Sequence, residues 1–382
     1  MGLDELIRLN FIIWKIQQSK IKRKIMRKLH KKIKFYLKQF RLFIGRVILD
    51  RKPSKEWHRA LLPNSKILFI RHDGKIGDFF VSSFVYREIK KQMPNIHIGI
   101  LAASETQNLF ETNHYIDSLY VVKKRSLFQF WLTGWKIRKE QYDIVIDLTD
   151  VLRNRDIVLV RCVNAAINVG YNKAHFKLFN YNVALNDEHI TLDYENALLK
   201  LGFQKIDRHN SLSDIPFSNE LEIFYQEKLS KQEYIVINFF GVVDYKAFSA
   251  KNRLRWLEKI KEAYPDKRIL VLTYPKVTQE LKDTLPSDEY LMYEKTSTIF
   301  DSVRLIKDAA LVITPDTSIV HIAATFNKPI LAFYMTSNIK KPRRKWLPVN
   351  SENVHIYFYR HNINEIDIDN IQLTSLFPDR NK

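Results

Sequence analysis

The sequence predicts an α/β protein made of two doubly wound parallel sheets, preceded by a basic helical arm. Three observations support this prediction. Short apolar runs alternate with segments of helical periodicity, one polar stretch interrupts the alternation, and the first 52 residues are unusually basic. The length of 382 residues is also more than one hydrophobic core normally organises, so we expect two domains.

The overall composition excludes several classes of protein. Apolar residues make up 46% of the chain and charged residues 27%, which excludes extended disorder, a collagen-like repeat and a polytopic membrane protein. The single cysteine, Cys162, excludes a disulfide framework and a multi-cysteine zinc site. It also indicates a reducing compartment, so we expect a cytoplasmic protein.

The formal net charge of +20 is concentrated at the N-terminus. Residues 1–52 contain sixteen Lys or Arg and three Asp or Glu, a net charge of +13, whereas the rest of the chain has a net charge of only +7. The body is therefore mildly basic, and its charge does not by itself indicate a nucleic-acid-binding protein.

Residues 18–48 of the arm are predicted to form a basic amphipathic helix. Nine Lys or Arg lie between Lys20 and Lys34. Such a helix is typical of membrane surfaces, where each basic residue contributes about 1 kcal/mol of attraction to anionic lipid. We therefore expect residues 1–50 to contact an anionic membrane surface. The apolar residues recur every three or four positions, on one face of the helix: Ile21, Ile25, Leu29, Ile33, Leu37, Phe40, Ile44 and Val47.

Other interpretations of the arm remain open. Its apolar stripe could instead dock on the body of the protein or on a partner helix, and its charge also permits contact with nucleic acid. The longest uncharged and mostly apolar run, Leu9–Trp14, is far shorter than the roughly 20 residues of a membrane span. Asp4 and Glu5 stand where a secretory signal would be basic, so we expect no such signal.

A first series of alternating elements follows the arm. Predicted strands cover residues 66–70, 96–101, 118–122, 143–148 and 166–170, and predicted helices cover residues 79–93, 104–112, 126–140 and 152–162. Strands that alternate with helices in this way form a parallel sheet covered by helices.

A polar stretch at residues 208–218 is the predicted linker, and a second series follows it. Predicted strands cover residues 234–238, 268–273, 290–293, 310–313 and 329–333, with helices at 250–264, 276–284, 298–307 and 317–326. We therefore predict an arm at residues 1–55, an N-terminal domain at 56–215 and a C-terminal domain at 216–382. Ligands of such folds bind in the cleft at the carboxyl ends of the strands.

The first candidate site motif follows the strand at residues 66–70. It reads Arg71-His72-Asp73-Gly74-Lys75-Ile76-Gly77-Asp78, and Asp78 is expected at the start of the next helix. A carboxylate there faces the cleft, but Asp is also a common helix N-cap, so capping is an equally open interpretation. The spacing matches neither a dinucleotide fingerprint nor a P-loop.

Two further motifs lie in the second series. Thr314-Pro315-Asp316-Thr317-Ser318-Ile319-Val320-His321 follows a strand, and a helix start of this kind offers backbone N–H groups to a phosphate. The alternative is a capping residue and a core histidine. Lys246 lies in the loop after residues 234–238. From this strand end it could pair with a diphosphate, because the phosphate-binding motif at residues 314–321 follows another strand of the same series.

These three loops, in this order, resemble glycosyltransferase family 9, the lipopolysaccharide heptosyltransferase family. The most specific part is Pro315-Asp316-Thr317-Ser318-Ile319-Val320-His321-Ile322-Ala323-Ala324 ahead of Lys328-Pro329. The resemblance runs over most of residues 66–335. It also includes Arg71, Ile76-Gly77-Asp78, Pro94-Asn95, residues 113–117, residues 142–148 and Gly170-Tyr171.

The resemblance implies a GT-B fold, in which two Rossmann-like domains face a cleft, and an inverting transfer that needs no metal and no cofactor. It implies that Asp78 is the general base and that Lys246, Asp316, Thr317, Ser318 and His321 bind the nucleotide-sugar donor. Arg71, Lys75 and Gly77 would support the acceptor side. Ser318 stands where family members usually have Gly, and Thr273–Lys276 replaces a Gly-rich segment.

The implied function is transfer of heptose from ADP-heptose to the inner core of lipopolysaccharide, by a cytoplasmic enzyme peripheral on the inner membrane. Three alternatives stay open. The donor could be another nucleotide-sugar, the protein could be a non-catalytic nucleotide-sugar-binding protein recruited to the membrane, or the arm could bind nucleic acid. Because the body of the protein is only mildly basic, we nevertheless expect no nucleic acid partner.

Overall fold

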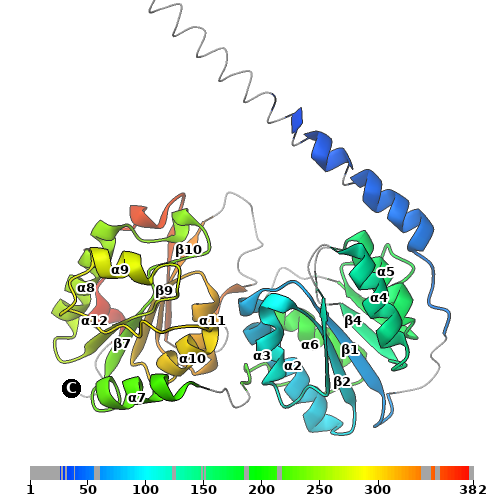
Figure 1. Cartoon of the computed structure of the whole chain (residues 1–382), viewed down its shortest axis with the longest axis horizontal. Coiled ribbons are helices and arrows are strands. Elements are labelled where there is room, and N and C mark those ends of the chain that lie inside the picture. Colours follow the sequence, from blue (N-terminus) through cyan, green and yellow to red (C-terminus); the bar gives the residue numbers. More distant parts are fainter. Residues whose placement is uncertain are drawn as a thin grey trace, which may run out of the picture.

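The computed structural model shows two parallel sheets with helices packed against them, and a helix that projects from the first domain (Figure 1). This architecture confirms the predicted α/β class. The structure describes residues 26, 29–30, 32–37, 39–55, 61–122, 126–147, 149, 152–184, 189–212, 217–336, 346–348 and 353–377.

The first sheet has six parallel strands in the order β3-β2-β1-β4-β5-β6. Alternate residues of β1 belong to different clusters: Ile67 and Phe69 face one hydrophobic core, and Leu68 and Ile70 face another. Because both faces are covered, the central strands are continuous apolar runs. The strands are β1 (Lys66–Arg71), β2 (His97–Ala103), β3 (Ser118–Val122), β4 (Ile144–Asp147), β5 (Ile167–Tyr171) and β6 (Tyr181–Val183).

Helices α2 to α5 of the first domain connect successive strands from β1 to β5, and α6 follows β6. They are α2 (Ile76–Gln92), α3 (Gln107–Glu111) after the 3₁₀ turn Ser104–Thr106, α4 (Leu127–Arg138), α5 (Asn154–Val163) and α6 (Ile190–Lys200). Gly134 allows α4 to lie close to α5, because a Cβ atom there would stand 2.6 Å from Cys162 Cβ.

The second sheet has five parallel strands in the order β11-β10-β9-β7-β8. Its strands are β7 (Tyr234–Ile237), β8 (Arg268–Val271), β9 (Leu311–Pro315), β10 (Ile330–Met335) and β11 (Val354–Tyr359). Its helices are α7 (Asn219–Lys228), α8 (Ala250–Ala263), α9 (Thr278–Thr284), α10 (Ile299–Lys307), α11 (Ser318–Thr325) and α12 (Leu373–Leu376), with 3₁₀ turns at Asp244–Lys246 and Ile363–Glu365. The predicted boundary at residues 215/216 lies outside the described residues.

The structure corrects some of the predicted elements. The strand predicted at residues 290–293 is wrong, because only Leu291 forms a single bridge, to Leu270. Strands β6 and β11 and helices α6, α7 and α12 were not predicted. Helix α2 begins at Ile76, three residues before the predicted start, and this changes the position of Asp78 within the helix.

The two domains meet through α2 and α11 (Figure 1). One hydrophobic cluster includes Phe79 and Phe80 of α2 together with Ile319 and Val320 of α11. The N-terminal ends of both helices carry predicted site residues, so this contact brings the two halves of the site together.

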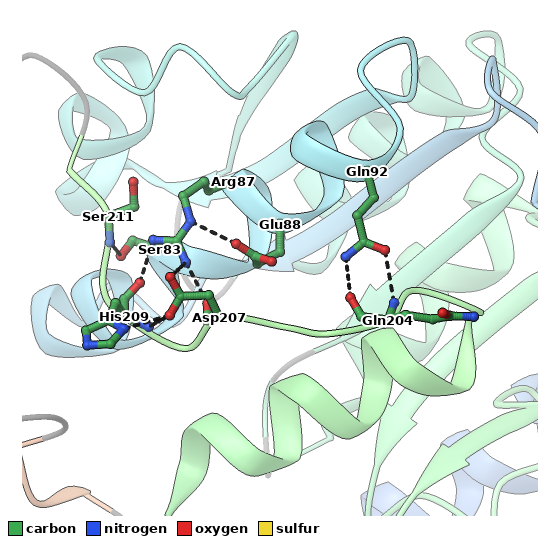
Figure 2. A network of polar contacts seen from close by, with 8 residues as sticks. All are labelled: Ser83, Arg87, Glu88, Gln92, Gln204, Asp207, His209 and Ser211. Atoms are coloured by element: carbon green, nitrogen blue, oxygen red, sulfur yellow. Dashed lines mark hydrogen bonds and ion pairs between the residues drawn. The ribbon is translucent and has the colours of Figure 1, made fainter.

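Helix α2 is also tied to the chain that leads toward the second domain (Figure 2). Gln92 exchanges two hydrogen bonds with the backbone of Gln204, at 2.7 and 2.9 Å, and the Arg87 guanidinium donates to the carbonyls of Asp207 and His209. Ser83 Oγ accepts from the backbone N–H of Ser211 at 2.8 Å. The helix that carries Asp78 is therefore fixed along its length to the connecting segment.

The described part of the arm is helical at residues 39–49 and touches the first domain near α5. Asn154 Nδ2 donates to the carbonyl of Arg41 at 2.7 Å, and the carboxylate of Asp50 accepts from the Leu178 backbone N–H at 2.8 Å. Gly45 lies directly against Asn154, where a larger residue would not fit. Residues 1–25 of the predicted arm lie outside the described residues.

The predicted apolar stripe of the arm does not face the body. Six of its members are between 40% and 65% exposed, so docking through this stripe is wrong for the described residues: Leu29, Ile33, Leu37, Phe40, Ile44 and Val47. A different face, with Gly45 buried and Leu49 partly buried, contacts the domain. No helix in the described parts of the chain is both long and apolar enough to cross a membrane.

Candidate active site

The loop after β1 places Asp78 in the first turn of α2. Gly74 has a φ of 66°, in the left-handed region that glycine tolerates, and the chain then enters the helix at Ile76. The N-cap residue is Lys75, so the interpretation of Asp78 as an N-cap is wrong. The Asp78 side chain is only 15% exposed, and its carboxylate lies 3.4 Å from Lys75 Nζ.

Asp78 shares a hydrogen bond with a second carboxyl group, that of Asp73. Burial, this hydrogen bond and the nearby Asp73 charge raise the pKa of Asp78 to about 7. Burial alone would raise the pKa of Asp73 as well, but the Arg71 guanidinium and the hydrogen bond from Asp78 hold it below its usual value. The pair therefore has one ionised and one proton-holding member near neutral pH, a property suited to proton transfer.

Arg71 and His72 connect this loop to neighbouring helices of the first domain. Arg71 is buried and donates to Ser82 Oγ on α2. His72 is also buried; its Nε2 lies 2.9 Å from the Asp156 carboxylate, and its ring packs against Phe130 with centroids 4.9 Å apart. Arg71 is thus a structural neighbour of the carboxyl pair and is shielded from solvent.

The loops of the second domain are joined at the carboxyl ends of β7 and β9. Asn238 Nδ2 donates to Thr314 Oγ1 and to the carbonyl of Phe240, both at 3.0 Å. Lys246 Nζ forms an ion pair with the Asp316 carboxylate at 2.6 Å. These contacts place the predicted donor-side residues Lys246 and Asp316 side by side.

The N-terminus of α11 lies at the same edge. Thr317 is the N-cap, and its Oγ1 accepts from the Ile319 backbone N–H at 3.3 Å, so the capping interpretation holds for this residue. Ser318 is the first residue of the helix. A helix start favours negative charge, which is compatible with a phosphate close to Thr317 and Ser318.

His321 lies on α11 at the contact between the domains. It is buried, and a Cβ atom on Gly77 would stand 3.2 Å from His321 Cδ2, so Gly77 allows this ring to approach α2. Burial lowers the pKa of His321 to about 4, and the ring is therefore neutral at pH 7. Asp78 follows Gly77, which places the histidine beside the catalytic candidate.

A cavity of about 320 Å³ lies between the domains. Ile76 contributes to it from α2, and Thr317 and Ser318 from α11. Its other walls include Tyr274, from the segment Thr273–Lys276 noted above, and four residues that were not predicted as site residues: Phe240, Thr296, Ser297 and Ser302. Aromatic rings beside hydroxyl groups suit a nucleoside, since a ring can stack on a base while hydroxyls bond a ribose.

The structure therefore unites most of the predicted site residues but separates some. Gly77, Asp78 and His321 meet at the interface, whereas Lys246 and Asp316 lie beside the cavity and do not line it. Lys75 is 65% exposed, and its Nζ lies 5.6 Å from the ring centroid of Trp346. Asp73 was missed as a site residue, although it stands in the same loop as Asp78.

The described residues contain no group of three or more His, Cys, Asp or Glu side chains that could hold a metal ion.

Comparison with protein families agrees with this arrangement. The model of glycosyltransferase family 9 (heptosyltransferase) matches residues 131–371. The chain belongs to glycosyltransferase family 9. The resemblance seen in the sequence is thereby confirmed, and so is the enzyme class, a glycosyltransferase of the heptosyltransferase type.

Similar proteins have the same fold. The chain is 24% identical to lipopolysaccharide heptosyltransferase 3 of Escherichia coli over 279 residues, which cover 68% of this chain and 80% of that one. A family 9 glycosyltransferase from Veillonella parvula superposes with a TM-score of 0.64 at 19% identity, covering 78% of this chain and 89% of its own. E. coli ADP-heptose lps heptosyltransferase II gives 0.59 at 16% identity, covering 76% and 90%. These structures confirm the GT-B fold.

The carboxyl pair predicts a specific pH dependence for this family 9 enzyme. A base must be deprotonated to act, so kcat/KM should rise with pH through the pKa of Asp78, about 7. Asp73→Asn removes the negative neighbour that raises this pKa, and it should move the rise to lower pH. The measurement is the pH profile of kcat/KM for both proteins. An unchanged profile, or one moved to higher pH, would contradict the coupling of the two carboxyl groups.

Proposed function

We propose that this enzyme transfers heptose from ADP-heptose to the inner core of lipopolysaccharide, with inversion at the anomeric carbon and without a metal ion. The observation that carries the proposal is the contact between α2 and α11, which brings Asp78 next to the donor-side loops of the second domain. The names of similar proteins support the sugar and the nucleotide: one is a lipopolysaccharide heptosyltransferase and another an ADP-heptose heptosyltransferase.

The proposed reaction is a single displacement in which Asp78 acts as the base. A hydroxyl oxygen of the acceptor attacks the anomeric carbon, and the bond from that carbon to the diphosphate oxygen breaks with its electron pair. The Asp78 carboxylate takes the hydroxyl proton. One displacement from the face opposite the leaving group inverts the anomeric centre.

The second domain stabilises the departing diphosphate. The Lys246 ammonium, held beside α11 by Asp316, and the N-terminus of α11 supply positive charge where negative charge develops. This arrangement performs the task that a divalent cation has in other transferases, which is why we propose a metal-independent reaction. The neutral His321 ring closes the contact between this helix and Gly77.

The nucleoside is assigned to the cavity between the domains. Phe240 and Tyr274 have ring centroids 6.1 Å apart at an angle of 82°, so one ring can stack on a base while the other borders its edge. The hydroxyls of Thr296, Ser297 and Ser302 line the same cavity. Because the proposed donor is ADP-heptose, ADP should bind more tightly than UDP, GDP or CMP in equilibrium titrations of the purified protein. Tighter binding of another nucleotide would replace ADP-heptose as the proposed donor while leaving the family assignment intact.

The same proposal includes the location of the enzyme, cytoplasmic and peripheral on the inner membrane. Its support is the charge of +13 in residues 1–52 and the exposed apolar stripe of the described arm, from Leu29 to Val47. A lipid-anchored acceptor at an anionic surface would then be concentrated near the cleft.

A further inference from the structure

Helix α4 carries a second exposed apolar face, which the fold does not use. Leu127, Phe128, Trp131, Leu132 and Trp135 are between 43% and 65% exposed. Their spacing places them on one side of the helix, opposite the buried residues of the same helix that pack in the core. We call these five residues the α4 face. An exposed apolar surface made of five large side chains is characteristic of a binding surface.

The aromatic residues of the α4 face form a continuous row. The rings of Phe128 and Trp131 stack with centroids 5.8 Å apart, and those of Trp131 and Trp135 lie 6.5 Å apart. The Arg138 guanidinium stands 5.1 Å from the centroid of a Trp135 ring. Tryptophan rings beside basic side chains are typical of the region where lipid headgroups meet acyl chains.

The charge around the α4 face favours an anionic surface. Helix α4 contains no acidic residue and ends with Lys136 and Arg138. A groove of about 520 Å³ joins the start of α4 to the arm, with Leu127 on one side and Lys34 and Arg41 on the other. This groove links the α4 face to the basic arm, and the arm helix lies close to α4 and α5 (Figure 1).

The α4 face also lies at the catalytic edge of the first domain. Helix α4 follows β3, so its first turn is at the carboxyl edge of the sheet, the edge from which Asp78 emerges after β1. Phe130, between the exposed residues Phe128 and Trp131, packs on His72 in the Asp78 loop. Helix α4 packs on the face of the first sheet opposite α2 and α11, so a bilayer against the α4 face would lie on the outer side of the first domain, near the edge that carries the Asp78 loop (Figure 1).

We propose that the α4 face inserts into the headgroup region of an anionic lipid bilayer, next to the arm, and so holds the carboxyl edge of the first domain near an acceptor anchored in that bilayer. The proposal rests on the membrane location within the proposed function. It adds an apolar component to the electrostatic attraction of the arm.

The test is flotation of the purified full-length protein with vesicles. The vesicles contain phosphatidylethanolamine with roughly a third phosphatidylglycerol, and pure phosphatidylcholine vesicles serve as the neutral comparison. The variant combines Phe128→Ser, Trp131→Ser and Trp135→Ser. Its matched control combines Leu199→Ser, Ile223→Ser and Phe358→Ser, which are equally exposed apolar residues on α6, α7 and β11.

The wild-type protein and the matched control should bind the anionic vesicles equally. The α4 variant should bind about tenfold more weakly or worse, and high salt should release what remains, because only the arm still holds it. Removal of residues 1–37, which keeps the arm contacts of Arg41 and Asp50, should instead weaken the preference for anionic lipid, because most of the positive charge of the arm is lost. Equal ADP affinity in all these proteins would confirm that the substitutions leave the fold intact.

Several outcomes would overturn the inference. If the α4 variant floats like the wild type, the α4 face does not insert, and the arm alone holds the protein. If the wild-type protein is a dimer that the α4 substitutions convert to a monomer, the α4 face is covered by a second copy. If the wild type binds no vesicles, the proposed membrane location fails as well, whereas transfer to a soluble acceptor would still test the reaction.

Discussion

Replacing Asp78 with Asn is expected to lower kcat by about a thousandfold, within the range seen when a general base is removed. Asn keeps the size of the side chain but cannot take the acceptor proton. Because Lys75 and not Asp78 is the N-cap of α2, the substitution should not weaken the start of the helix. The affinity for the donor nucleotide should stay within about twofold, since the donor contacts lie in the other domain.

The measurement is single-turnover transfer together with nucleotide titration and thermal unfolding. Asp117→Asn is a suitable control, because this carboxylate caps the start of β2 through the Ile98 backbone N–H, away from the cleft. It should keep the kcat of its folded fraction. A transfer rate near that of the wild type in Asp78→Asn would show that another group accepts the proton.

Lys246→Ala is expected to give the second largest loss, about a hundredfold in kcat together with weaker binding of the donor diphosphate. The Lys246 ammonium forms an ion pair at 2.6 Å with Asp316, the residue that precedes the N-cap of α11. Its removal leaves the departing diphosphate without a cationic partner there. The loss should therefore affect both binding and turnover, unlike that of Asp78→Asn.

The control for this prediction is Lys251→Ala, a lysine on the exposed surface of α8. It should leave both donor affinity and kcat unchanged. Should Lys246→Ala keep the donor affinity and kcat of the wild type, Lys246 would be reduced to a structural partner of Asp316, and the N-terminus of α11 would be the only source of positive charge in the proposal.

The general position of the site could be predicted because it depends on local patterns. Asp78 follows a strand of the first sheet, and Lys246 and Thr317 follow strands of the second; the parallel strands of each sheet end at one edge. Their roles in the reaction remain predictions. What the sequence shows is the edge on which they lie.

Other features depend on contacts that no local pattern contains. The approach of His321 to Gly77 is a contact between two domains, and the hydrogen bond of Asp73 to Asp78 depends on the left-handed turn at Gly74. Periodicity predicted α4 as a helix, but it could not show that Trp131 and Trp135 face solvent, because both sides of the helix are apolar.

Most predicted strands are present, and the one wrong strand and the missed strand β11 have a simpler explanation. Residues 290–293 form a short apolar run, and a run of this length fits a strand or a buried loop equally well. Strand β11, by contrast, has a signal in the sequence: residues 354–359 are Val, His, Ile, Tyr, Phe and Tyr, which are mainly β-branched and aromatic.

The most direct test of the central claim is transfer by the purified full-length enzyme, followed through the mass of the acceptor. The enzyme is supplied with truncated lipopolysaccharide and, in separate reactions, with ADP-heptose or with UDP-, GDP- and CMP-sugars. We predict a gain of one heptose that requires both ADP-heptose and an intact Asp78. No gain from any donor, in protein that still binds nucleotide, would contradict the proposed transfer and favour a nucleotide-sugar-binding protein without turnover.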